Sequence, residues 1–157
     1  MSDGKKKRNV TIDSNIFVSY VISKVDCSIE KKVIVKSMSD DRLMLTDIIW
    51  EEVLNFADSK KNRANLTRED IADRLNALNL KVVTIGPAPS DEKLKEMGYS
   101  ISKDADLKIL YSVHTTNSVI LVTRDGHFSG DVKGLTAKVM DPETYIRNLR
   151  ERECGRD

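Results

Sequence analysis

The sequence has few cysteines and histidines, and it lacks the pattern of a membrane span or of a secretory signal. Only two cysteines and two histidines occur among 157 residues, and the separation of the cysteines matches neither a disulfide nor a zinc motif. We expect Cys27 to be a small buried thiol and Cys154 a thiol in the tail, both in a reducing compartment. No apolar run approaches the roughly 18 residues of a membrane span. The basic start MSDGKKKRN also lacks the apolar stretch of a secretory signal, so we expect a cytoplasmic protein.

The sequence also lacks an excess of charge of either sign. The formal net charge is +1, from 26 basic and 25 acidic residues, so a bulk electrostatic attraction to nucleic acid is not indicated. Glycine-rich phosphate loops are absent, which disfavours nucleotide-binding switches. An apolar fraction of 39% and a charged fraction of 32% suit a globular protein of one domain. We expect a flexible basic arm over residues 1–8, a single domain over 9–150 and a polar tail over 151–157.

What the sequence does contain is an alternation of strand and helix patterns. Apolar or alternating runs predict strands at residues 9–13, 42–46, 80–85, 118–123 and 137–141. Capping residues and helical periodicity predict helices near residues 16–22, 28–39, 47–61, 65–79, 91–97, 103–115 and 142–152. Ser102 is the expected cap of the helix at 103–115. This alternation predicts an α/β domain, with a three-layer α/β/α fold around a mostly parallel sheet of about five strands.

Two of the predicted strands end in an acid. Asp13 follows the first strand, and Asp125 follows the strand at 118–123. Each has an ordinary structural explanation, since Asp13 could cap a helix and Asp125 could belong to a turn with Gly126. Ser14 or Asn15 could cap the helix equally well, so capping does not require Asp13. In an open parallel sheet, ligands bind beyond the carboxyl ends of the strands.

Two predicted helices each offer a pair of acids, and helical phase separates the members of each pair. In the helix at 47–61, Glu51 lies opposite the apolar face, whereas Glu52 lies at its border. In the helix at 103–115, Asp106 lies within the apolar stripe. Asp104 lies on the far side near the helix start, where the helix dipole stabilises an acid. Glu52 and Asp106 are therefore the members of each pair that lack an ordinary explanation.

The acids Asp13, Glu52, Asp106 and Asp125 are all expected at one edge of the sheet. Bringing them together without a cation would raise their pKa values through mutual repulsion. A divalent cation removes the conflict, and a set of hard oxygen ligands favours Mg²⁺ or Mn²⁺ over zinc. The four acids together predict a metal site that none of them predicts alone.

Four motifs in this order resemble the PIN domain family of metal-dependent endoribonucleases, which includes the VapC-type toxins. The segments are VTIDSNIFVSYVI near the start, LTDIIWEEVLNF, DADLKIL and VILVTRDGHF. The resemblance extends from residue 9 to about residue 128. It implies a PIN-like, Rossmann-like fold.

The resemblance also implies roles for particular residues. The implied metal-binding and catalytic acids are Asp13, Glu52, Asp106 and Asp125. Asn15 and Thr123 are implied as supporting polar residues, and Lys103 and Arg124 adjoin the acids as candidate substrate contacts. His127 stands where such proteins often carry another polar or acidic residue, although an ordinary surface-loop histidine is the favoured interpretation.

The implied chemistry is hydrolysis of phosphodiester bonds in RNA with one or two Mg²⁺ or Mn²⁺ ions. The role would be that of a toxin in a toxin–antitoxin pair or of an RNA-processing nuclease, with RNA, an antitoxin and a second copy as expected partners. A haloacid-dehalogenase-like phosphatase is disfavoured, because Asn15 stands where its second aspartate would be. The non-enzymatic alternative is an inert PIN-like scaffold that binds RNA or protein.

Overall fold

The structure, a computed structural model, describes residues 6–23, 25, 27–103, 106–129 and 132–154. These residues form a parallel sheet of four strands, in the order β2-β1-β5-β6, and a separate parallel pair, β3-β4. The strands are β1 (Asn9–Ile12), β2 (Arg42–Leu43), β3 (Leu45–Thr46), β4 (Val82–Val83), β5 (Ile120–Val122) and β6 (Lys138–Met140). The prediction of an α/β fold around a parallel sheet is confirmed.

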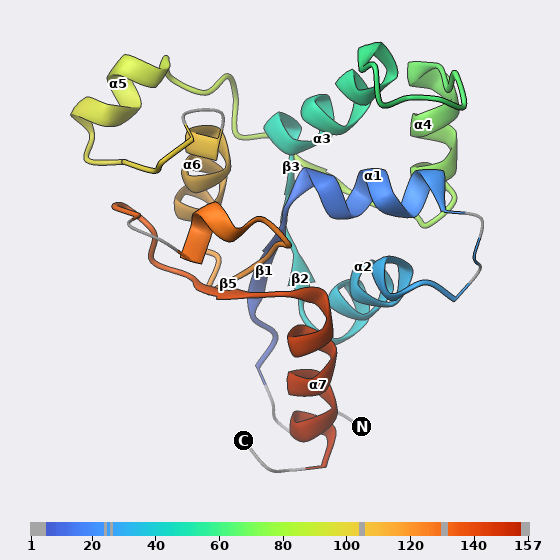
Figure 1. The fold of residues 1–157 in the computed structure, drawn as a ribbon. Coiled ribbons are helices and arrows are strands. Elements are labelled where there is room, and N and C mark those ends of the chain that lie inside the picture. Colours follow the sequence, from blue (N-terminus) through green and yellow to red (C-terminus); the bar gives the residue numbers. More distant parts are fainter. Residues whose placement is uncertain (1–5, 24, 26, 104–105, 130–131, 155–157) are drawn as a thin grey trace.

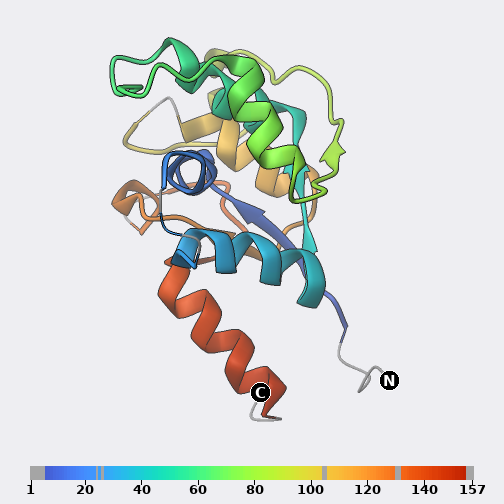
Figure 2. The ribbon, with the colours of Figure 1, turned by 90° about the vertical axis from the view of Figure 1, so that its right-hand side faces the viewer.

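Helices cover both faces of the sheet. They are α1 (Ser14–Ile22), α2 (Ile29–Asp40), α3 (Asp47–Leu54), α4 (Arg68–Asn76), α5 (Asp91–Glu96), α6 (Leu107–Thr115) and α7 (Pro142–Glu153). Short 3₁₀ turns form η1 (Asn55–Asp58) and η3 (Gly126–Ser129). α2 and α7 lie side by side on one face, whereas α3, α4 and α6 lie on the other (Figure 1, Figure 2). Because helices cover both faces, the residues of the central strands are mostly apolar.

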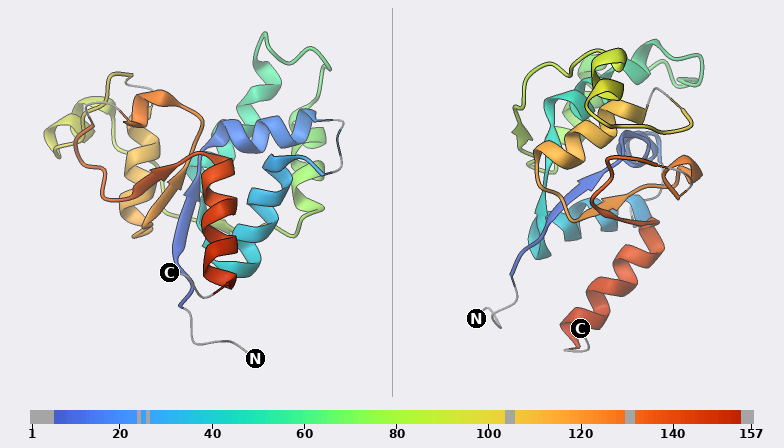
Figure 3. Two further views of the ribbon diagram at one scale, coloured as in Figure 1. Left: turned by 60° about the horizontal axis from the view of Figure 1, so that its bottom comes forward. Right: turned by 90° about the vertical axis from the view of Figure 1, so that its left-hand side faces the viewer.

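One continuous apolar core joins the sheet to the helices on its two faces. Fully buried side chains come from five different helices: Phe17, Ile34, Ile49, Leu110 and Tyr145. Burial of an apolar side chain of this size contributes about 1.5–3 kcal/mol to stability. Figure 3 shows α7 packed beside α2, where it closes the core below β6. Within the described residues, no helix is long and apolar enough to cross a membrane.

The pairing of β1 with β5 determines which residues emerge together at the carboxyl edge. Ile12 pairs with Val122, and the backbone N–H of Asp13 donates to the carbonyl of Val122 at 2.9 Å. Figure 1 shows α1 beginning at this edge, close to the start of α3. The segments that carry Asp13 and Asp125 therefore leave the sheet next to each other.

The predicted strand at 42–46 was wrong in its extent, because two sheets divide it. Met44 still donates its N–H to the carbonyl of Val10 at 2.8 Å, but β3 then pairs with β4 and not with β1. The predicted strand at 80–85 is correspondingly reduced to β4 and lies outside the main sheet. Met44 is the last residue in this segment whose backbone reaches β1, which leaves the following residues free to pair elsewhere.

Two further local predictions were also wrong. The helix expected after Ser102 begins only at Leu107, with Asp106 in the N-cap position; the N–H of Asp106 donates to the carbonyl of Lys103 at 3.0 Å. Cys27 is exposed and not buried, since it lies in the connection before the cap of α2 and not in an apolar face.

Candidate metal centre

The four predicted acids meet at the carboxyl edge, and each is carried by a different element. Asp13 follows β1, Asp125 follows β5, Glu52 lies in α3, and Asp106 precedes α6. Burial raises the pKa of Asp13, Glu52 and Asp106, and in each case the charge of another acid in this set raises it further. The tertiary structure therefore concentrates four carboxyl groups at one edge of the sheet, although they come from four separate elements.

Asp13 occupies the N-cap position of α1 without acting as a cap. Its side chain accepts no capping hydrogen bond from the amides of α1. The carboxylate, on a residue only 3% exposed, instead accepts a hydrogen bond from the Thr123 hydroxyl at 2.7 Å. Burial is the largest influence on its pKa and raises it, the hydroxyls of Thr123 and Ser14 lower it, and the charge of Asp125 raises it again. The hydroxyl of Thr123 thus ties Asp13 to the segment that carries Asp125, while Ser14 and the backbone amide of Asn15 in α1 also lower its pKa.

Thr123 connects the two strand ends that carry acids. Its buried hydroxyl donates to Oδ2 of Asp13 and accepts the backbone N–H of Asp125 at 2.9 Å. A hydroxyl can donate one hydrogen bond and also accept one, so Thr123 can make both of these bonds at the same time. The hydroxyl thereby holds the loop after β5 against the end of β1, in the supporting position expected for Thr123.

Ser14 joins Glu52 to the same group of acids, a role that was not predicted. The Ser14 hydroxyl lies 2.6 Å from Oε1 of Glu52 and 3.3 Å from Oδ1 of Asp13. Glu52 is an exposed residue as a whole, but its carboxylate is surrounded by protein, and this burial raises its pKa. Glu51 points to a different partner, the guanidinium of Arg68. The geometry thus favours Glu52, and the position of Ser14 next to Asp13 was the available sequence signal.

Asp106 contains the least satisfied atom of the group. The residue is 9% exposed, and within the described residues its buried Oδ2 has no hydrogen-bond partner. Burial and the charge of Asp125 raise its pKa from 3.8 to about 6, with further contributions from a side-chain hydrogen bond with Asp125 and from the charge of Asp13. The expected position within a helical stripe was wrong, because Asp106 is the N-cap of α6 and precedes its first residue. Asp104, the alternative acid, lies outside the described residues.

His127 is exposed in the turn η3, as expected for a surface-loop histidine, but its ring also lies against two of the acids. Its Nδ1 is 2.6 Å from Oδ1 of Asp125 and 3.8 Å from Oδ2 of Asp106. Its backbone N–H also donates to Oδ1 of Asp125 at 2.9 Å. Potential ligand atoms of these three residues all lie within 4.8 Å of one another, close enough for one metal ion. The short Asp-Gly-His spacing was the signal in the sequence.

Arg124 and Lys103, the two predicted substrate contacts, differ in whether acids of the protein already bind them. The Arg124 guanidinium is bonded to Glu143 at 2.9 and 3.1 Å and to Glu30 at 3.0 Å. It therefore ties the loop after β5 to α2 and α7, and is occupied by acids of the protein itself. Lys103 is exposed, and its charge lowers the pKa of Asp106.

Glu52 also opens onto a cleft of about 610 Å³ beside the acids. The cleft is lined by Asp47, Ile48, Glu51, Glu52, Asn55, Gly86, Pro87, Ala88 and Lys108. The charges of Lys108 and Lys103 both lower the pKa of Glu52, against the larger effect of burial. Lys108 was not predicted as a neighbour of the site. Asn15, predicted as a supporting residue, is exposed in the first turn of α1.

Comparisons with known proteins agree with this architecture. The family model described as PIN domain matches residues 10–130. A crystal structure of VapBC2 from Rickettsia felis bound to a DNA fragment from their promoter contains a chain with a similar fold, at a TM-score of 0.57. The identity is 15%, and the alignment covers 85% of this chain and 99% of the other. The comparison with curated proteins gives no match.

Proposed function

This chain belongs to the PIN domain family, and we propose that it is an endoribonuclease that depends on a divalent metal ion. The observation that supports this most directly is the buried Oδ2 of Asp106, which has no hydrogen-bond partner among the described residues although other acids lie close to it. An unpartnered buried carboxylate oxygen is costly. A cation held by the same group of acids would remove that cost.

The residues present fit Mg²⁺ or Mn²⁺. We assign Asp13, Glu52, Asp106 and Asp125 as the acids that hold the ion, because hard carboxylate oxygens are the preferred ligands of both. When bound, the ion would supply charge stabilisation at the scissile phosphate and a lower pKa for an attacking water. One ion or two would suit these acids.

The other residues of the site would keep the acids in position and attract the substrate. Thr123 and Ser14 hold the carboxylates of Asp13 and Glu52 through hydroxyl hydrogen bonds. Glu52 borders the cleft beside the acids, where its carboxylate would orient the attacking water or accept its proton. Lys103 is the better placed of the two predicted contacts for a phosphate, because acids already bind Arg124.

RNA as the substrate follows from the family and from the resemblance to VapC-type toxins. We propose the toxin of a toxin–antitoxin pair as the first role to examine, with an antitoxin and a second copy of the chain as partners, and RNA processing as the second. The VapBC2 structure supports the shared fold, which is common to both roles. An inert scaffold is disfavoured, because a scaffold gains no stability from acids that raise one another's pKa values.

The test is cleavage of a single-stranded RNA in Mg²⁺, in Mn²⁺ and in excess chelator. Wild type should cleave only with metal, and Asp106→Asn should lose roughly 100-fold or more in rate through lost electrostatic stabilisation. Glu151→Gln, which changes an exposed acid on α7, is the matched control and should retain the wild-type rate. Full activity of Asp106→Asn, or cleavage in chelator, would contradict the proposal.

A further inference from the structure

We propose that His127 is a nitrogen ligand of this centre and that the site therefore prefers a first-row transition ion, Mn²⁺ in particular, over Mg²⁺. The inference rests on the proposed metal centre and concerns which ion that centre takes. It assigns a fifth protein ligand, of a different chemical kind, to a site otherwise made of carboxylates.

The His127 ring lies close enough to two of the acids to share an ion with them. Nδ1 lies 2.6 Å from Oδ1 of Asp125 and 3.8 Å from Oδ2 of Asp106. Metal–ligand bonds of about 2.1 Å place neighbouring ligands of an octahedral ion roughly 3.0 Å apart and opposite ligands roughly 4.2 Å apart. The separation from Asp106 lies between these two values. The separation from Asp125 is a hydrogen-bond distance, which would lengthen by about 0.4 Å when both groups bind one ion. The backbone bond from His127 N–H to Asp125 also fixes the loop that carries the ring.

An ion pair between His127 and Asp125 does not account for the whole arrangement. Oδ2 of Asp106 is the oxygen that faces the His127 ring, and it remains without a hydrogen-bond partner as far as the structure describes the chain. A residue that is 9% exposed cannot obtain this partner readily from bulk water. A cation shared by the ring nitrogen and both carboxylates satisfies the oxygen and explains the close approach.

A neutral imidazole also suits the charge of this site better than another carboxylate. The charges of Asp125 and Asp13 already raise the pKa of Asp106, so a further acid would add repulsion. Imidazole adds a donor without adding charge. It is a good ligand for transition ions, whereas Mg²⁺ prefers oxygen ligands and retains its waters. The mixed donor set should therefore favour Mn²⁺.

The chain provides its own control, because it has one other histidine. His114 lies in α6 and makes an edge-to-face ring contact with Tyr99, with ring centroids 6.0 Å apart. It is exposed and belongs to neither the acids nor the cleft. His114→Gln therefore removes an imidazole of the same chemistry without touching the proposed centre.

The experiment is pulsed electron paramagnetic resonance of the full chain with one equivalent of Mn²⁺, which detects modulation from a directly bound imidazole nitrogen. Wild type and His114→Gln should show this modulation, and His127→Gln should lose it. Calorimetric titration should show Mn²⁺ affinity falling about tenfold or more in His127→Gln, with a smaller change for Mg²⁺. In His127→Asp, the ratio of Mn²⁺ to Mg²⁺ affinity should fall because oxygen replaces nitrogen.

The outcomes separate this inference from the proposed function. Mn²⁺ that binds wild type and is lost in Asp106→Asn, but shows no nitrogen modulation, would overturn the role of His127 and leave the carboxylate centre intact. Modulation that persists in His127→Gln would overturn it equally. Failure of wild type to bind either ion would overturn the metal centre itself. Thermal unfolding of each variant without metal checks that the fold is retained.

Discussion

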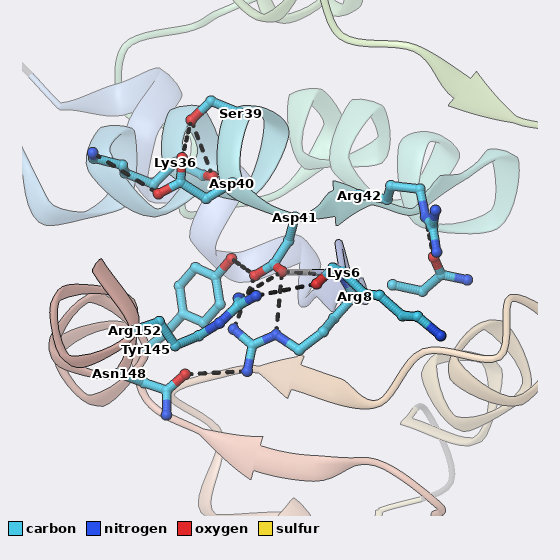
Figure 4. A network of polar contacts seen from close by, with 11 residues as sticks. Lys6, Arg8, Lys36, Ser39, Asp40, Asp41, Arg42, Tyr145, Asn148 and Arg152 are labelled. Carbon is cyan, nitrogen blue, oxygen red and sulfur yellow. Dashed lines mark hydrogen bonds and ion pairs between the residues drawn. The ribbon is translucent and has the colours of Figure 1, made fainter. Parts of the chain in front are cut away.

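Two buried aspartates at opposite edges of the central sheet have contrasting surroundings. Asp41 precedes β2 at the amino edge, and Asp106 lies at the carboxyl edge with the other acids. The Asp41 side chain is fully buried and accepts bonds from Arg8 at 3.1 Å, Arg152 at 3.0 Å and Tyr145 at 2.7 Å. Figure 4 shows these three side chains converging on Asp41, Arg8 from the residue before β1 and the other two from α7.

The difference in partners reverses the direction of the pKa shift. Burial acts to raise the pKa of Asp41, but the hydrogen bonds from Arg8 and Tyr145 together lower it below its usual value. For Asp106, burial and neighbouring acids act in the same direction, and the pKa rises to about 6. A buried carboxylate with a full set of hydrogen-bond donors, such as Asp41, connects segments of the fold. A buried carboxylate without them, such as Asp106, has an oxygen that can still bind a ligand.

The largest effect on stability is expected at Asp41, the acid whose charge is compensated. Asp41→Asn should lower the free energy of unfolding by about 3–5 kcal/mol, because it leaves buried cationic partners without their counter-charge. Urea unfolding followed by circular dichroism measures this loss. The matched control is Asp40→Asn, which affects a part-exposed contact to Lys36 at 4.0 Å and an exposed bond from the Ser39 hydroxyl at 3.0 Å, and should cost less than about 1 kcal/mol. Equal losses in both variants would show that Asp41 is not a special position.

The next effect distinguishes two neighbouring acids of α3. Glu52→Gln should reduce the rate of RNA cleavage by roughly 100-fold, equivalent to about 2.7 kcal/mol in the barrier. Glu51→Gln should leave the rate within about threefold of wild type, because Glu51 faces Arg68. Single-turnover cleavage in Mn²⁺ measures both rates. A greater loss in Glu51→Gln would reverse the assignment.

A smaller effect, of opposite sign to that of Asp41, is expected from Asp106→Asn in chelator. The folded-state pKa of Asp106 is raised from 3.8 to about 6, so the folded protein binds the proton more tightly than the unfolded chain. Wild type should therefore lose stability as the pH rises from about 4 to about 6 and not recover it above. Asp106→Asn should be about 1–2 kcal/mol more stable at pH 7 after allowance for solvent screening.

Chemical unfolding at a series of pH values tests this prediction. The difference between Asp106→Asn and wild type should shrink below about pH 4, where Asp106 is protonated in both states. Saturating Mn²⁺ should reverse the order at pH 7, because binding to the folded state stabilises only the wild type strongly. If Asp106→Asn is less stable than wild type in chelator at pH 7, Asp106 is a structural residue like Asp41.

The smallest effect is expected at Arg124, which connects the two regions through α7. Arg124→Gln should lower stability by about 1 kcal/mol, because the guanidinium and Glu143 are half-exposed and only Glu30 is mostly buried. Loosening the loop that carries Asp125 should nevertheless reduce Mn²⁺ affinity by up to about tenfold, since Arg124 supports a residue that would hold the ion. Calorimetric titration at low and high salt measures this change. Unchanged affinity would mean that Thr123 alone positions the loop.

Much of the fold could be predicted from local patterns. The strand-to-Asp transition at Asp13 is readable because apolar runs buried on both faces end abruptly in polar residues. Helical phase also separated Glu52 from Glu51 in the direction that the structure favours. The same argument failed as a reason for Asp106, because α6 begins only at Leu107 and local pattern does not reveal where a helix begins to within a few residues.

By itself, the sequence determined the parallel α/β architecture and placed a carboxylate at the end of two strands, since both follow from the periodicity of neighbouring residues. Only the tertiary structure decided which acids are compensated. Asp41 and Asp106 are the same residue type, and nothing in their neighbours along the chain reveals that Arg8 and Arg152 reach one while His127 faces the other. Ionisation and metal binding depend on charges within a few ångströms in space, and those distances exist only after the chain has folded.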